Sequence, residues 1–241
     1  MYSFLLKPKW IATHLLVVLL MFTMVNLASW QWGRYNDRKD FNATLVARFD
    51  ATTKPLEDIV ASAIPADIEW LPAEVRGTYL QGEDISVVNV SQNGMAGYNA
   101  ITPMKMSDGR IVLVNRGFMP LASEFPKAPS GEVTILGRIR ATAQRRTGAV
   151  SDPATGELVE IQRIDIDRLQ PQIEGELLPV YVQMLSSSPT DSPMLSAIAD
   201  PDFSNGPHLS YTIQWLIFTV CAAGGWLALV MREARKRRTA Q

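Results

Sequence analysis

Histidine and cysteine, the side chains that most often supply nucleophiles, proton shuttles or metal ligands, are nearly absent from this 241-residue chain. It has two histidines, His14 and His208, and one cysteine, Cys221. Ser-His-Asp and Cys-His hydrolases need a histidine beside the nucleophile, and residues 31–207 contain none. The sequence therefore predicts a protein that is not an enzyme, and it makes the two histidines the first candidates for cofactor chemistry.

His208 is the stronger candidate, as a metal ligand in a cofactor site. Imidazole is a common axial ligand of haem iron, and Trp30, Tyr211 and Trp215 could supply flat aromatic walls beside it. The alternative is an imidazole that only hydrogen-bonds locally, next to aromatic residues that form a membrane-interface belt. For His14 we expect the local role.

Two charge-free segments must position these residues. Residues 10–30 and 209–231 contain no Asp, Glu, Lys or Arg. A helix of about 20 apolar residues crosses the hydrocarbon core of a bilayer, and a helix satisfies its own backbone groups in lipid. We therefore expect two transmembrane helices. The exit Ala28-Ser29-Trp30 is a poor cleavage site for a signal peptide, so we expect the first helix to be retained.

The basic residues indicate the orientation. Arg232, Arg235, Lys236, Arg237 and Arg238 lie in the tail 232–241 that follows the second segment. Lys and Arg concentrate in cytoplasmic flanks. The prediction is a plasma-membrane protein with both termini in the cytoplasm and residues 31–208 outside; in a eukaryote the membrane would be the mitochondrial inner membrane.

Small and polar residues within the segments predict that the two helices pack together. Ala222, Ala223, Gly224, Gly225 and Ala228 give the second helix a face that permits close approach. Asn26 is a polar residue inside the first helix, and such residues usually face another helix.

Residues 31–185 are expected to form one extracytoplasmic α+β domain, mainly an antiparallel sheet with the shape of a barrel or sandwich. Residues 31–50 would extend the first helix as a stalk, residues 54–63 would form a second, short helix, and residues 165–172 would form a short helix or turn. The segment 186–208 would be an extended linker back to the membrane. Alternating or continuous apolar runs predict strands at 74–80, 85–90, 98–106, 111–115, 133–141, 159–164 and 180–185.

The sequence also predicts the position of one turn and the role of one arginine. Asp108-Gly109 lies between two apolar runs, which is a strong signal for a β-hairpin. Asn115 and Arg116 would close the strand that follows, and we expect Arg116 to have a structural role, capping or pairing with a carboxylate.

Five blocks of residues are distributed along nearly the whole chain. They are Ser29-Trp30-Gln31-Trp32-Gly33-Arg34-Tyr35, Arg76-Gly77-Thr78-Tyr79, Gly97-Tyr98-Asn99-Ala100-Ile101-Thr102-Pro103, Val112-Leu113-Val114-Asn115-Arg116-Gly117-Phe118-Met119-Pro120 and Gly206-Pro207-His208-Leu209-Ser210-Tyr211-Thr212-Ile213-Gln214-Trp215. In this combination they resemble the surfeit-locus cytochrome c oxidase assembly family, in its bacterial form. Phe118 stands where members usually have Trp, and Pro207 where many have Asn.

The resemblance implies an assembly factor for haem-copper cytochrome c oxidase, one that helps haem a reach the large subunit of that enzyme. It implies haem a as a cofactor or cargo, with His208 as the residue concerned. Two other functions remain open: an envelope scaffold or sensor that binds a membrane partner without a cofactor, and, less favoured, a membrane-bound enzyme. The net charge of −1 does not indicate binding to nucleic acid, which depends on an excess of Lys and Arg to neutralise phosphates.

Overall fold

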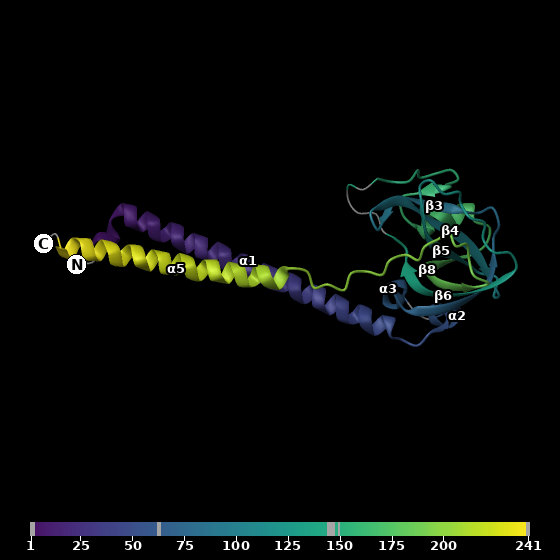
Figure 1. Cartoon of the computed structure of the whole chain (residues 1–241), viewed down its shortest axis with the longest axis horizontal. Coiled ribbons are helices and arrows are strands. Elements are labelled where there is room, and N and C mark those ends of the chain that lie inside the picture. Colours follow the sequence, from purple (N-terminus) through teal and green to yellow (C-terminus); the bar gives the residue numbers. More distant parts are fainter. Residues whose placement is uncertain (1–2, 62–63, 144–147, 149, 240–241) are drawn as a thin grey trace. The chain divides into compact units, whose positions relative to one another are not determined.

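The computed structural model describes residues 3–61, 64–143, 148 and 150–239. It contains two compact units: a helical unit made of the chain up to Thr44 and from Asp202 onward, and a strand domain, Leu45–Pro201. Figure 1 labels the two long helices, α1 and α5, and the strands β3, β4, β5, β6 and β8 of the second unit.

The helical unit is built from α1 (Pro8–Phe49) and α5 (His208–Thr239), with a short 3-10 turn, η1 (Ser3–Leu6), before α1. The last turn of α1 belongs to the strand domain. Both helices are long and apolar enough to cross a membrane, and the most apolar stretch of each is almost entirely exposed. A long apolar helix that buries little of its surface inside the protein is suited to lipid, so the two helices indicate a membrane protein.

Contacts near both ends of the apolar segments join the helices. At one end the indole Nε1 of Trp226 donates to Nδ1 of His14 at 3.0 Å. At the other, Nδ1 of His208 lies 2.8 Å from Oε1 of Gln31. The two helices therefore run antiparallel, as the prediction of two spans requires.

The run of small residues in α5 contributes only part of the contact we expected. A Cβ added at Gly224 or Gly225 would meet nothing within 4 Å, and Ala228 is exposed, whereas Ala222 and Ala223 are half-buried. The two glycines and Ala228 therefore leave an open face. Asn26 of α1 is also exposed, and its amide donates to the backbone oxygen of Phe22 one turn earlier.

The strand domain contains a closed ring of strands. Its sheet has the order β1-β2-β6-β8-β5-β4-β3-β7, and an additional pairing of β2 with β4 closes the ring β2-β6-β8-β5-β4. The strands are β1 (Lys54–Pro55), β2 (Pro72–Tyr79), β3 (Ile85–Gln92), β4 (Met95–Met106), β5 (Ile111–Pro120), β6 (Glu132–Ala141), β7 (Glu160–Ile161) and β8 (Leu177–Ser188).

The predicted fold class is confirmed, with a mixed rather than purely antiparallel sheet. The pairs β1–β2, β3–β7 and β5–β8 are parallel, and the other pairs are antiparallel. Alternation buries Val133, Ile135 and Ile139 on one face of β6. Such side chains from all five strands of the ring form its core.

The short helices of the domain are α2 (Leu56–Val60), α3 (Pro65–Ile68) and α4 (Ile166–Leu169), the last followed by a 3-10 turn, η2 (Gln170–Gln172). The predicted helix over 54–63 is shorter than expected, because residues 54–55 pair with β2; residues 62–63 lie outside the described chain. The predicted strand over 159–164 is reduced to β7.

The hairpin at Asp108-Gly109 is confirmed. It joins β4 to β5, with Gly109 at a φ of 88°, a conformation that glycine adopts without strain. The Asp108 carboxylate accepts from the backbone and the guanidinium of Arg110. Burial would raise the pKa of Asp108, but these hydrogen bonds and the charge of Arg110 outweigh it and lower the pKa.

One prediction about the chain after this hairpin was wrong. Asn115 and Arg116 do not close β5, which continues to Pro120 through Gly117 at a φ of 142°. The segment after 185 carries further pairing: β8 extends to Ser188, and Ser196 then pairs with Phe118 as an isolated bridge. The backbone groups of Phe118 in β5 thereby form hydrogen bonds with those of Ser196, a pairing that the composition of the segment does not predict.

Candidate functional site

The site predicted around His208 lies in the helical unit, where α5 begins. Gly206 precedes it at a φ of 67°, and the Tyr211 N–H donates to the backbone oxygen of Pro207 as the first turn of α5 forms. The Thr212 hydroxyl donates to the backbone oxygen of His208 at 3.0 Å. The imidazole is therefore carried by the first residue of α5.

The segment before His208 is held by polar side chains of α1. Nδ2 of Asn42 donates to the oxygen of Phe203 at 2.6 Å and to Oδ1 of Asn205 at 3.0 Å. The guanidinium of Arg38 donates to the oxygens of Ser204 and Asp202, at 3.1 and 2.7 Å. These contacts fix the entry to α5 and with it the position of His208.

Gln31 contacts one nitrogen of the imidazole. Its amide oxygen lies 2.8 Å from Nδ1 of His208. In the tautomer with the proton on Nδ1, this nitrogen donates to the amide oxygen, and the lone pair is on Nε2. Within the described ranges no hydrogen bond reaches Nε2. A histidine that donates one ring N–H to a fixed oxygen and presents the other nitrogen is the usual arrangement of a metal-binding imidazole.

Sequence reasoning named His208 but missed Gln31. Gln31 could have been found from its position in the sequence. It is a polar residue directly after the first charge-free segment, and in two antiparallel helices this position lies beside the start of the second segment.

The three predicted aromatic residues lie near the same ends of the helices but do not enclose His208. Trp30 and Tyr211 are 58% and 46% exposed. Trp215 packs edge-on against Phe218, with ring centroids 5.8 Å apart. Among the described residues none of the three rings contacts the imidazole. Trp30 and Tyr211 are therefore exposed aromatic surfaces, and Trp215 is half-buried.

His14 has a different surrounding. Its Nδ1 accepts from Trp226, and its ring lies between those of Trp10 and Trp226 at centroid distances of 5.8 and 5.7 Å. This is a locally hydrogen-bonded imidazole, as we expected for it.

The strand domain contains one buried charged network, centred on Arg116. The guanidinium makes two hydrogen bonds to Asp191, from Nε at 2.8 Å and from Nη2 at 2.6 Å. It also donates to the backbone oxygens of Pro126 and Lys127, and Asp84 lies 3.9 Å from Nη1. The expectation that Arg116 pairs with a carboxylate is confirmed, and the pair fastens the returning segment to β5.

The ring of Tyr79 lies under the same guanidinium, with its centroid 5.6 Å from Cζ of Arg116. Burial, reinforced by the charge of Asp191, raises the pKa of its phenol. The Tyr79 hydroxyl has no hydrogen-bond partner in the described part of the chain.

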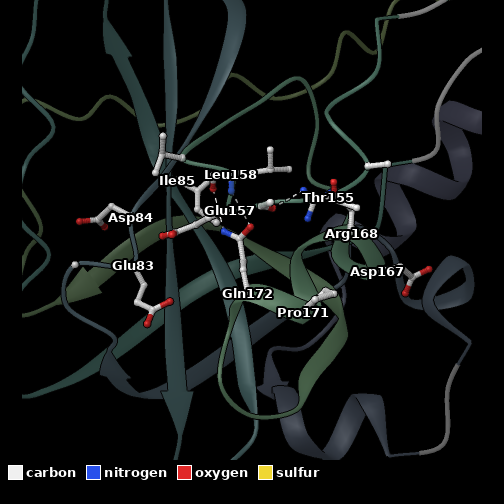
Figure 2. A pocket seen from close by; sticks show the side chains of 14 residues that line it. Glu83, Asp84, Ile85, Thr155, Glu157, Leu158, Asp167, Arg168, Pro171 and Gln172 are labelled. Carbon is white, nitrogen blue, oxygen red and sulfur yellow. Dashed lines mark hydrogen bonds between the residues drawn. The ribbon is translucent and has the colours of Figure 1, made fainter.

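A hollow of about 720 Å³ opens between the start of β3 and the segment that follows β6 (Figure 2). Glu83, Asp84, Glu157 and Asp167 line it. The guanidinium of Arg168, also in its wall, donates to the oxygens of Pro153 and Gly156 and is thereby fixed. No group of three or more His, Cys, Asp or Glu suited to a metal ion occurs among the residues that the structure describes.

Comparison with known proteins identifies the family. The model of the SURF1 family matches residues 18–220. Uncharacterized SURF1-like proteins of Mycobacterium bovis and Mycobacterium tuberculosis are 28% identical over 98% of this chain and 89% of their own length. A SURF1-like protein of Monosiga brevicollis is 26% identical over 84% of this chain and 82% of its own. The chain belongs to the SURF1 family.

Proposed function

We propose that this protein is an assembly factor for haem-copper cytochrome c oxidase, which helps haem a reach the large subunit. Membership of the SURF1 family, which covers 18–220, supports a role in assembling this oxidase. Two apolar helices and one strand domain suit a protein that acts beside a membrane-embedded enzyme. The orientation we propose has both termini in the cytoplasm of a bacterium, because the basic tail follows α5.

The arrangement of His208 and Gln31 carries the haem part of the proposal. Gln31 holds the proton on Nδ1, so Nε2 is the nitrogen that would bind the haem iron. Trp30, Tyr211 and Trp215 would contribute apolar surface to the porphyrin. A haem held by this one imidazole would be bound less firmly than one held by two protein ligands, which would suit a carrier that must release its cargo to the large subunit.

The experiment is to purify the full-length protein from a host that makes haem a and to record its visible spectrum. The wild type should show a Soret band, and His208→Ala should lose it. Gln31→Leu should keep part of it, because the imidazole remains but its tautomer is no longer fixed. His14→Ala is the matched control, since it removes the other imidazole of the helical unit; its spectrum should match that of the wild type.

A Soret band that survives in His208→Ala would refute His208 as the ligand. The assembly role has a separate readout. Deletion of the gene in its source organism should lower cytochrome c oxidase activity, and the wild-type gene should restore it. Restoration by a wild-type protein that never carries haem would instead favour a scaffold that holds the large subunit, and unchanged oxidase activity after deletion would refute both.

A further inference from the structure

A second hollow, of about 410 Å³, lies in the helical unit between the start of α1 and the end of α5. Lys9, Arg232 and Lys236 are three of the residues that line it, with Trp10 and Thr13. Positive side chains from two chain ends thus meet at one hollow. Nothing in the function proposed above uses it.

Among the residues that the structure describes, no carboxylate forms an ion pair with the three cations of this hollow. Its one carboxylate, Glu233, is held by Arg237, with an ion-pair distance of 2.7 Å and a hydrogen bond of 2.8 Å. Over the described ranges no ion pair reaches Lys9, Arg232 or Lys236. Three cations around one hollow favour an anionic ligand.

The wall of the hollow is rigidly built. Trp10 packs edge-on against Phe4 at 5.0 Å, and Phe4 is fully buried. Phe4 forms a small apolar cluster with Val230 and Ala234 of α5. The short turn before α1 therefore folds back onto α5 and holds the two helix ends together.

The position of the hollow along the helices identifies the kind of anion. Trp10 begins the first charge-free segment, and Arg232 is the first charge after the second one. Both residues therefore lie where the hydrocarbon core of a bilayer ends and the headgroups begin. Basic pockets between membrane helices at this level bind the headgroups of anionic lipids.

We propose that this hollow binds the phosphate headgroup of an anionic phospholipid, with Lys9, Arg232 and Lys236 around the phosphate. The indole of Trp10 would lie beside the glycerol region and the upper part of the acyl chains. A neighbouring hollow of about 480 Å³ shares Arg232 and Lys236 and adds Arg235. A lipid with two phosphates could engage both hollows, so we expect cardiolipin to bind more tightly than phosphatidylglycerol.

The test measures lipid binding to the full-length protein in mixed micelles, by native mass spectrometry with phosphatidylglycerol, cardiolipin or phosphatidylcholine added. Both anionic lipids should be retained in preference to phosphatidylcholine. The double variant Lys9→Gln/Arg232→Gln should bind phosphatidylglycerol about thirtyfold more weakly. This expectation follows because each cation near the lipid surface raises the affinity by a factor of at least about five, and the factors for the two cations multiply.

The matched control is Lys7→Gln/Arg238→Gln, which removes one lysine and one arginine from the same chain ends but from outside both hollows. Its affinity should fall less than about threefold, which is the screened effect of net charge alone. The exchange Lys9→Arg/Arg232→Lys should keep wild-type binding, which separates loss of charge from loss of folding. Equal losses in the test and control variants would overturn the proposal.

A free anion is the competing source of the same chemistry. Inorganic phosphate and glycerol 3-phosphate, added at millimolar concentration, should neither displace phosphatidylglycerol nor raise the thermal unfolding temperature. Displacement by either would assign the hollow to a soluble phosphate and overturn the lipid assignment. Equal retention of phosphatidylcholine and phosphatidylglycerol would overturn it as well.

Discussion

Replacing Asp191 by asparagine should destabilise the strand domain far more than the loss of an ordinary ion pair. The Arg116 side chain is fully buried and that of Asp191 is 6% exposed. The variant keeps the shape of the carboxylate but removes the charge that Arg116 faces at 2.6 and 2.8 Å. It leaves a buried guanidinium without its main counter-charge.

The magnitude follows from what remains around Arg116. Removing one partner of a buried pair costs about 3–5 kcal/mol. The backbone oxygens of Pro126 and Lys127 still accept from the guanidinium, and Asp84 at 3.9 Å still offers a negative charge. We therefore expect the lower end, about 3 kcal/mol, which lowers the unfolding temperature of a domain of this size by about 6–12 °C.

The assay is thermal unfolding of the full-length protein in detergent, followed by near-ultraviolet circular dichroism. The control is Asp200→Asn. Asp200 also pairs with an arginine, Arg138, whose side chain is 13% exposed, but the Asp200 side chain is 49% exposed. Water reaches this carboxylate, so we expect the loss of its charge to cost less than about 1 kcal/mol. If both variants lose less than about 1 kcal/mol, water reaches Arg116 and the argument from burial is wrong.

Other outcomes follow from the same structure. Tyr79→Phe should be within about 1 kcal/mol of the wild type at neutral pH, because the hydroxyl it removes is buried without a described partner. The pKa of Tyr79 is raised in the folded protein. Its contribution to the free energy of unfolding is therefore complete below the ordinary tyrosine pKa of about 10 and is lost as the pH rises further. Above that pH, the stability of Tyr79→Phe should fall less steeply with pH than that of the wild type. Gly97→Ala should destabilise the domain by about 2 kcal/mol in the same thermal assay, because a Cβ there would overlap the Met119 oxygen and the Phe118 ring. A periplasmic reporter inserted at Asp108-Gly109 should be active and one fused at the C-terminus inactive; the reverse pattern would refute the proposed orientation.

Local features of the sequence were enough to predict most elements of this fold. The charge-free segments predict α1 and α5, because a missing charge over about 20 residues has few explanations other than a bilayer. Alternation in 133–141 predicts β6, and Asp108-Gly109 predicts a turn whose backbone angles glycine favours. Each of these signals lies within a few residues of the structure that it determines.

Features that depend on distant residues could not be predicted in the same way. The pairing of β2 with β4 closes the ring, but nothing in either strand alone specifies its second neighbour. The segment after 185 is rich in Ser, Pro and Asp, which is typical of a linker, yet Asp191 in it is the partner of Arg116. The sequence predicts that Arg116 needs a carboxylate but not which of the 24 acidic residues supplies it.

The candidate haem site shows why the type of a residue and its chemistry are separate questions. The identity of His208, at the start of α5, does not by itself say which ring nitrogen has a hydrogen-bond partner. That partner, Gln31, comes from α1 at a separation of 177 positions, and Asn42 of α1 holds the backbone leading into α5. The partner of Nδ1 therefore comes from the helix that does not carry the histidine, which is why the sequence could name His208 as a candidate but could not name the residue that contacts it.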